Sequence, residues 1–288
     1  MKNGREIFKS SGDPEDQEVV REREEQARKY LAEFAERRFS GEFKNFLSSV
    51  DFTDLKRLFR RIAERSTVDP ETMNFVTAER IIQFDMIMPV AAYSPGKNLI
   101  FFPYDEIKSN AKELQIDPEL YTTFVLCHEE AHATSKIVCR AFSEARSDYQ
   151  ERQTGFAQSI GEKTSFEILE EGVTQKLAME IFLEYAKTHF DLKRTADFMK
   201  KLKGAMQGAQ EYGSEVKITD LLIRKISGKS GMPEDKVWYG FIRAKYEGER
   251  FEDEELQALL AEATTSDFLP KLKYAKHENI DDLIKDLQ

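Results

Sequence analysis

The segment His128-Glu129-Glu130-Ala131-His132 lies near the middle of the 288-residue chain. It belongs to a stretch that begins at Asp117-Pro118 and continues to about Arg152 without a further proline or any glycine. An acidic residue followed by proline is typical of a helix start, because the acid caps free backbone N–H groups and proline fits the first helical position. The pattern therefore predicts one helix over 118–152 that carries both histidines.

The spacing of the two histidines predicts a metal site. Side chains four positions apart project from the same helix face, about 5–6 Å apart, so the imidazoles of His128 and His132 can bind one ion. Glu129 follows the first histidine and can reach a water molecule on that ion as a general base. Zinc held by three protein ligands leaves one position for such a water. We expect one Zn²⁺ per chain.

A structural alternative is that both histidines are hydrogen-bonded core residues. The chain contains only four histidines. From residue frequencies, an H-E-x-x-H sequence arises by chance in such a chain with a probability of roughly one per cent or less. The metal interpretation is therefore favoured.

A third ligand is needed, and the best candidates lie in Ile168-Leu169-Glu170-Glu171-Gly172-Val173-Thr174-Gln175. The capping-box pattern Thr164-Ser165-Phe166-Glu167 predicts a second helix that starts at Thr164 and extends to about Lys187. This helix can run against the first one and present a carboxylate to the metal. Gly172 would let the two helices approach closely.

H-E-x-x-H on one helix followed by Glu-Gly-x-Thr on the next resembles the gluzincin group of zinc metallopeptidases. The resemblance covers about residues 118–180. It implies a zincin-like core, hydrolysis of a protein or peptide substrate, and Glu171 as the third ligand, because the glutamate before the glycine has this role in the group. The separation of the two motifs is longer than in the shortest members. The alternatives to Glu171 are Glu170, Glu151, Glu144, His189 and His277. On an unbroken helix Glu144 would lie about 18 Å beyond His132.

Other candidate residues lie outside these motifs. The group often uses a tyrosine or histidine to stabilise the oxyanion of the reaction, and Tyr239 or Arg243 could act in this way. The neighbouring Trp238 and Phe241 give the same stretch an ordinary packing interpretation. The strand expected at 99–102 could bind an extended peptide, as edge strands do.

The remaining pattern predicts a mostly helical α+β protein. A hairpin is expected over 80–104 around the turn Ser94–Asn98, and no other strand region stands out. Helices are expected at 14–38 and 43–65, and the C-terminal third has helical periodicity at 191–210, 218–228, 233–246, 252–263 and 277–287. We expect a disordered tail (1–14), an N-terminal helical segment (15–70), a catalytic core with a small sheet (71–190) and a helical C-terminal subdomain (191–288).

Composition excludes several functions and suggests a location. A formal charge of −10 argues against a general nucleic-acid binder. No apolar run is long enough to span a membrane, and the start of the chain lacks the apolar stretch of a signal peptide. Cys127 and Cys139 are about 18 Å apart if both lie on the expected helix, too far for a disulfide. We therefore expect reduced thiols and a cytoplasmic protein.

Two classes of function remain open. One is a zinc metallopeptidase with Glu129 as general base. The other is a non-catalytic or regulated helical interaction protein that keeps a structural zinc; Glu129 argues against it, because a structural site needs a closed fourth ligand and no base. Residues 14–38 could be an inhibitory segment or a solvated amphipathic helix. Substrate, endo- or exopeptidase action and oligomeric state are not determined by the sequence.

Overall fold

The computed structural model describes residues 8–9, 29, 40–84, 91–94, 98–141, 150–160, 163–208, 210–248 and 254–288. Its helices are α2 (Gly41–Ser49), α3 (Phe52–Arg65), α4 (Tyr104–Glu113), α5 (Pro118–Ala133), α6 (Glu167–His189), α7 (Leu192–Gly208), α8 (Gln210–Ser230), α9 (Glu234–Glu247), α10 (Glu254–Ala263), α11 (Phe268–Lys273) and α12 (Ile280–Leu287). The strands are β1 (Phe8–Lys9), β2 (Ile81–Gln83), β3 (Ala92–Ser94), β4 (Leu99–Phe102), β5 (Ile137–Ala141), β6 (Gln150–Thr154), β7 (Ala157–Ile160) and β8 (Lys163–Ser165). Short 3₁₀ turns occur at Pro70–Thr72, Ala78–Arg80 and His277–Asn279. The structure is thus mostly helical with small sheets, as the sequence predicts.

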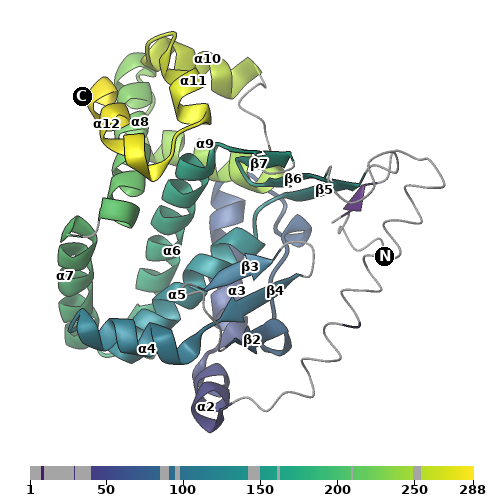
Figure 1. Cartoon of the computed structure of the whole chain (residues 1–288), viewed down its shortest axis with the longest axis vertical. Helices are drawn as coiled ribbons and strands as arrows, with labels where there is room; N and C mark the ends of the chain where they lie inside the picture. The colour runs from purple at the N-terminus through teal and green to yellow at the C-terminus, as the bar shows by residue number, and fades with distance from the viewer. Residues whose placement is uncertain are drawn as a thin grey trace.

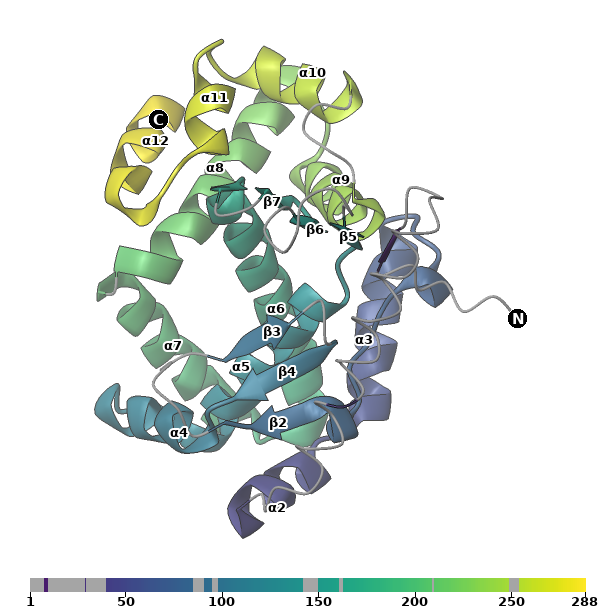
Figure 2. The same ribbon diagram turned by 45° about the vertical axis from the view of Figure 1, so that its right-hand side comes forward.

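The smaller sheet confirms the expected hairpin and corrects one detail. Its order is β2-β4-β3, with β3 antiparallel and β2 parallel to β4. The strand at 99–102 is therefore central, with both edges paired, and the expectation that it could bind a peptide as an edge strand is wrong. Among the strands described in this sheet, β3 lies at the edge next to α5 (Figure 2).

The expected helix over 118–152 ends at Ala133, and the chain then enters a second sheet of order β1-β5-β6-β7-β8. The hydroxyls of Thr134 and Ser135 donate to the carbonyl of Ala131, and such local bonds compete with helix continuation. The β-branched pair Ile137-Val138 then favours a strand. The expectation of one strand region is wrong because the next strand, Gln150–Thr154, has no apolar alternation to reveal it.

The start of α6 also differs from the capping-box prediction. Residues 163–165 form strand β8, and α6 begins at Glu167 after Phe166, whose φ of 58° is left-handed. The separation argued for the two cysteines is wrong as well, since Cys127 lies in α5 and Cys139 in β5. Cys127 is a free, buried thiol, and burial raises its pKa.

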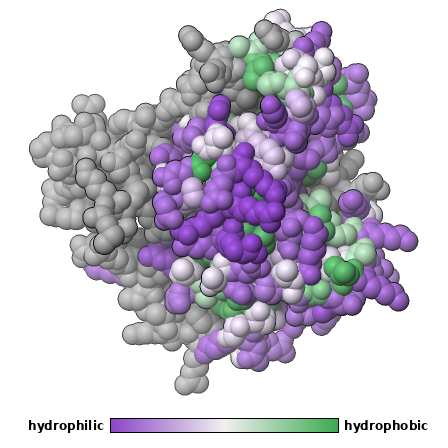
Figure 3. Space-filling view, turned by 180° about the vertical axis from the view of Figure 1, so that it is seen from behind, coloured by the Kyte–Doolittle hydropathy of each residue, from purple (hydrophilic) through white to green (hydrophobic). Residues whose placement is uncertain are grey.

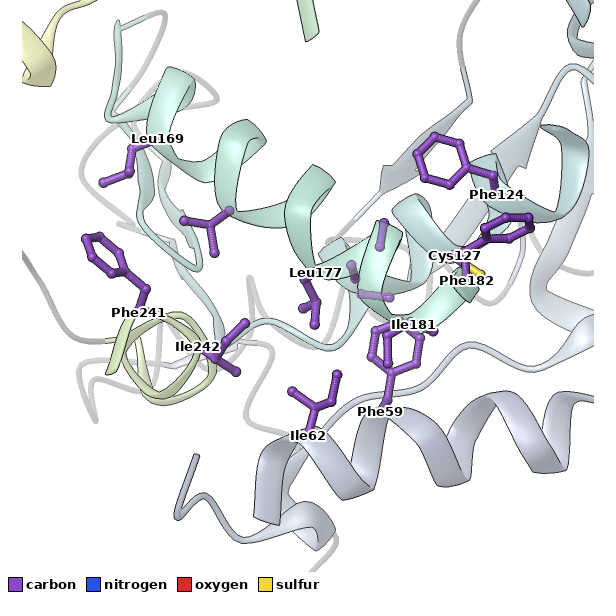
Figure 4. Packing of buried hydrophobic residues seen from close by; sticks show 14 of the residues in the cluster. Phe59, Ile62, Phe124, Cys127, Leu169, Leu177, Ile181, Phe182, Phe241 and Ile242 are labelled. Carbon is purple, nitrogen blue, oxygen red and sulfur yellow. The ribbon is translucent and has the colours of Figure 1, made fainter. Parts of the chain in front are cut away.

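The core is built around α6, which packs against α5 on one side and α8 on another (Figure 1). In Figure 4, Phe241 of α9 lies near Leu169 and Phe59 of α3 lies near Ile181, so the two rings pack along α6 on either side of Leu177. The same cluster of buried residues extends from Phe43 to Leu287. The C-terminal third is helical, as predicted, with α8 longer at its start and α11 additional.

Some of the predicted elements lie in residues that the structure does not describe. The helix expected over 14–38 and the tail 1–14 lie there, apart from Phe8–Lys9 and Lys29.

The stretch expected as a helix over 43–65 forms two helices, α2 and α3. Within the described ranges, no helix has the length and apolar character that a membrane span requires. The rear face in Figure 3 is mainly hydrophilic where it is described, with small separate apolar groups.

Candidate metal centre

Helix α5 holds both histidines on its inner side. The Asp117 carboxylate accepts from the backbone N–H of Glu119 and Leu120, as expected of an N-cap. Eleven residues of α5 are buried, including His128 and the two residues that follow it. Because α5 is buried on most sides, its polar side chains point toward neighbouring elements. The imidazoles of His128 and His132 both contact residues of α6.

The structure brings His128, His132 and Glu171 together. The two Nε2 atoms are 3.2 Å apart. The Glu171 carboxylate places Oε2 3.4 Å from Nε2 of His128 and Oε1 3.3 Å from Nε2 of His132. Among the described residues, this is the group of acidic, histidine and cysteine side chains whose ligand atoms converge closely enough to hold a metal ion.

The other nitrogen of each imidazole has a protein partner. Nδ1 of His128 donates to Oε1 of Gln175 over 2.6 Å. Nδ1 of His132 lies 3.4 Å from Oε1 of Glu170 and 3.5 Å from the hydroxyl of Thr174. Acceptors at Nδ1 favour a proton on that nitrogen, so Nε2, the nitrogen nearest Glu171, is the one that would bind a metal ion.

The three side chains lie close enough together to be ligands of one metal ion. Zinc–nitrogen bonds of about 2.0–2.1 Å place two tetrahedral ligands about 3.3–3.4 Å apart. The two Nε2 atoms are 3.2 Å apart, close to this separation, and each lies 3.3–3.4 Å from a different oxygen of the Glu171 carboxylate. With one ligand atom taken from each residue, the three atoms lie within 4.8 Å of one another. Two imidazoles and one carboxylate are also a ligand set that zinc binds in enzymes. The three residues can therefore hold a metal ion.

The electrostatics of the triad shows strong mutual attraction. Burial alone raises the pKa of Glu171, but the neighbouring imidazoles His132 and His128 outweigh it and hold the pKa well below its ordinary value. Burial alone lowers the pKa of His132, but the Glu171 carboxylate, with hydrogen bonds to both glutamates, raises it to about 10. The site thus concentrates negative charge beside the imidazoles, as a cation site requires.

Glu129 and Glu130 occupy different surroundings. Glu129 is buried beside the triad; burial raises its pKa, and the imidazoles of His128 and His132 and the backbone of Tyr93 in β3 partly offset this rise. Glu130 is fully buried and accepts from the backbone N–H of Val76 over 3.1 Å, which anchors the segment before β2. Of these two carboxylates, Glu129 is the one close enough to the triad for its pKa to be influenced by all three members, and its role as a general base stays a prediction.

Glu170, the nearest alternative to Glu171, is already engaged. Its Oε2 accepts from the backbone N–H of Phe156 over 2.9 Å. Its Oε1 accepts from the hydroxyl of Thr174 over 3.2 Å and from the ammonium group of Lys245. Burial alone raises the pKa of Glu170, but Lys245, with His132, lowers it to about 2. The structure thus places Glu171 with the two histidines, as the resemblance implies, and pairs Glu170 with Lys245.

The remaining candidates lie elsewhere. The hydroxyl of Tyr239 lies 3.4 Å from Nη1 of Arg65, where α3 and α9 meet. No contact among the described residues places it beside the triad, so its role in stabilising the oxyanion stays a prediction. Elsewhere, Arg243 pairs with Glu247, His189 with Asp54 and His277 with Glu215, while Glu151 lies in β6 and Glu144 outside the described residues.

Sequence reasoning assigned no role to Gln175 or Lys245. Gln175 follows Glu171 by one helical turn, so its place on the same face was accessible from spacing. Lys245 continues the apolar positions Trp238, Phe241 and Ile242 of α9 at helical spacing. A lysine on the buried face of a helix signals a buried acidic partner, although the sequence does not say which.

Comparisons of the chain with protein-family models, with curated proteins and with solved structures found no match.

Proposed function

We propose that the protein is a zinc-dependent metallopeptidase of the gluzincin type, with a zincin-like core, that hydrolyses peptide bonds of a protein or peptide. The observation that carries this proposal is the triad His128, His132 and Glu171, whose ligand atoms lie close enough together to hold one ion, with the buried Glu129 beside it. The two imidazoles are held by Gln175 and by Glu170, which is the support that catalytic zinc ligands need.

The residues have distinct roles in this proposal. His128, His132 and Glu171 would hold the ion, which when bound supplies a Lewis acid that polarises the scissile carbonyl and acidifies water. Glu129 accepts the proton of the attacking water and delivers it to the leaving amine, and its position beside the ligands suits both transfers. Burial excludes bulk water and strengthens these interactions.

The β3 strand is a suitable surface for an extended substrate. It pairs with β4 along one edge. It also contacts α5, and the backbone of Tyr93 in β3 is near enough to Glu129 to lower its pKa, so the strand lies close to the general base. An extended peptide added to β3 would pass the site, with backbone hydrogen bonds that do not depend on its sequence. A cytoplasmic location and an inhibitory role for residues 14–38 remain predictions.

The experiment is zinc content and peptide hydrolysis for the wild type, Glu171→Ala and Glu129→Gln. We expect about one zinc per chain in the wild type, a clear loss in Glu171→Ala because two imidazoles alone bind weakly, and wild-type zinc in Glu129→Gln. Hydrolysis of unstructured protein should fall by at least about 10²–10⁴-fold in Glu129→Gln, because proton transfer contributes that much.

His189→Ala is the matched control, since this histidine pairs with Asp54 away from the triad. It should retain both zinc and activity. A wild type that takes up no zinc when zinc is supplied would refute the metal centre. Zinc binding with equal hydrolysis by Glu129→Gln would refute the catalytic role.

A further inference from the structure

Lys245 is unusual because its side chain has no exposed surface. It lies near the end of α9, a helix otherwise packed through apolar residues such as Phe241 and Ile242. A buried ammonium group is costly unless charged and polar partners surround it. Its ammonium group donates to the Glu170 carboxylate and, over 2.6 Å, to the hydroxyl of Thr174.

These partners connect Lys245 to one of the metal-binding histidines. Glu170 Oε1, which accepts from Lys245, lies 3.4 Å from Nδ1 of His132. The Thr174 hydroxyl lies 3.5 Å from the same nitrogen. A chain of contacts therefore runs from Lys245 of α9 through Glu170 to the imidazole of His132. The Thr174 hydroxyl contacts all three side chains.

The surroundings of Glu170 fix its carboxylate in place. The backbone N–H of Phe156 holds Oε2 from the turn between β6 and β7. Gly155 precedes it with a φ of 55°, and a Cβ there would lie 2.3 Å from Oε2, so the turn approaches the carboxylate as only glycine allows. Gln153 donates to the carbonyls of Gly155 and Gly248, which ties this turn to the end of α9.

We propose that Lys245 is a positioning residue of the metal centre: it neutralises Glu170 and keeps this carboxylate as the acceptor for Nδ1–H of His132, so that Glu171 alone of the adjacent pair binds the ion. The inference rests on the proposed zinc site. Without the lysine, Glu170 would be a buried anion next to a cation site. Its carboxylate would then be attracted toward the ion.

The test is zinc affinity, measured by competition with a chelator, and the visible absorption of the cobalt-substituted protein. We expect Lys245→Met to bind zinc about 10–100-fold more weakly, the usual effect of removing support from a metal ligand. Its cobalt absorption should weaken and shift, as it does when a fifth ligand joins a tetrahedral ion. The double variant Glu170→Gln/Lys245→Met has no buried charge at this place, so it should fold and regain a wild-type cobalt spectrum, with zinc affinity still reduced.

Lys176→Met is the matched control. Lys176 belongs to α6 and pairs with Asp220 over 2.7 Å, away from the triad. It should bind zinc and cobalt as the wild type does.

Three outcomes separate the inference from the proposed function. A Lys245→Met protein that melts at a lower temperature but binds zinc and cobalt like the wild type would overturn the positioning role alone. If the double variant has the same altered cobalt spectrum as Lys245→Met, Glu170 is not the group that moves, and the inference fails. A wild type that binds no zinc would overturn both the metal centre and the inference. The zinc content of the wild type and of Glu171→Ala reveals this result without any Lys245 variant.

Discussion

Asp117 shows how one side chain supports the metal centre from a distance. It caps the N-terminus of α5 through two backbone N–H groups, and its carboxylate also accepts from Arg194 of α7 over 2.8 Å. The guanidinium of Arg194 holds the pKa of Asp117 below its ordinary value of 3.8. The residue therefore fixes both where α5 begins and how α7 docks against it.

Two substitutions separate these roles. Asp117→Ala should lower the free energy of unfolding at neutral pH by about 1–2 kcal/mol, because it removes the cap and the ion pair. Asp117→Asn keeps a good cap and should lose less than about 1 kcal/mol. Urea titrations at several pH values measure both. Because the native pKa is lowered, the wild-type advantage over Asp117→Asn is present above pH 3.8 and is lost as the pH falls through the native pKa. An advantage that is constant down to acid pH would contradict the ion-pair role.

At the scale of helices, Gly172 explains how closely α6 packs. The sequence suggested that this glycine lets the two metal-binding helices approach each other. The structure instead places α8 against it: a Cβ at Gly172 would lie 2.4 Å from the hydroxyl of Thr219 and 2.5 Å from the backbone oxygen of Glu215. The close approach is real, but its partner is a helix from the C-terminal third.

Gly172→Ala should therefore destabilise the protein, by about 1–3 kcal/mol, because α8 must move to admit the methyl group. Gly204→Ala is the control, since Gly204 lies in helix α7 with no atom within 4 Å of an added Cβ. It should stabilise by about 0.5–1 kcal/mol through helix propensity. Denaturant unfolding of the two variants decides the matter; equal stabilisation by both alanines would show that α6 and α8 are not in close contact.

What the sequence predicted well depends on local spacing. His128 and His132 are four residues apart on one helix, so their convergence follows from helical geometry alone. The local Glu-Gly-x-Thr pattern favours Glu171 through the family resemblance, but the ion pair that engages Glu170 comes from Lys245, which is distant in sequence and belongs to no local pattern. The strand at Gln150–Thr154 was missed because a polar strand is stabilised by its neighbours rather than by its own composition.

At the scale of the whole molecule, the buried residues form one main cluster from α2 to α12. Helix α8 contacts α6 as well as α9, α10 and α12, so the C-terminal helices are joined to the helix that carries Glu171. The single tryptophan, Trp238, donates to Glu180 of α6 over 3.0 Å and reports on this junction. A division at residue 190 would cut through this packing.

Unfolding should therefore occur in one transition. We expect the fluorescence of Trp238 and the helical circular dichroism signal to change at the same denaturant concentration, since one core loses its packing as a unit. Two separated transitions would instead support an independent subdomain over 191–288. The metal-free protein is the appropriate sample, because a bound ion would add its own stabilisation.

The path from Lys245 to His132 also has a consequence for biosynthesis. A chain emerging from the ribosome at about 5–20 residues per second exposes both histidines and Glu171 several seconds before Lys245 is made. During that interval Glu170 lacks its cation, and α8 and α9 are not yet in place against α6. If the lysine positions the site as proposed, a nascent chain carries all three ligands before it has a properly arranged centre, so hydrolytic activity would begin only after the C-terminal helices have folded.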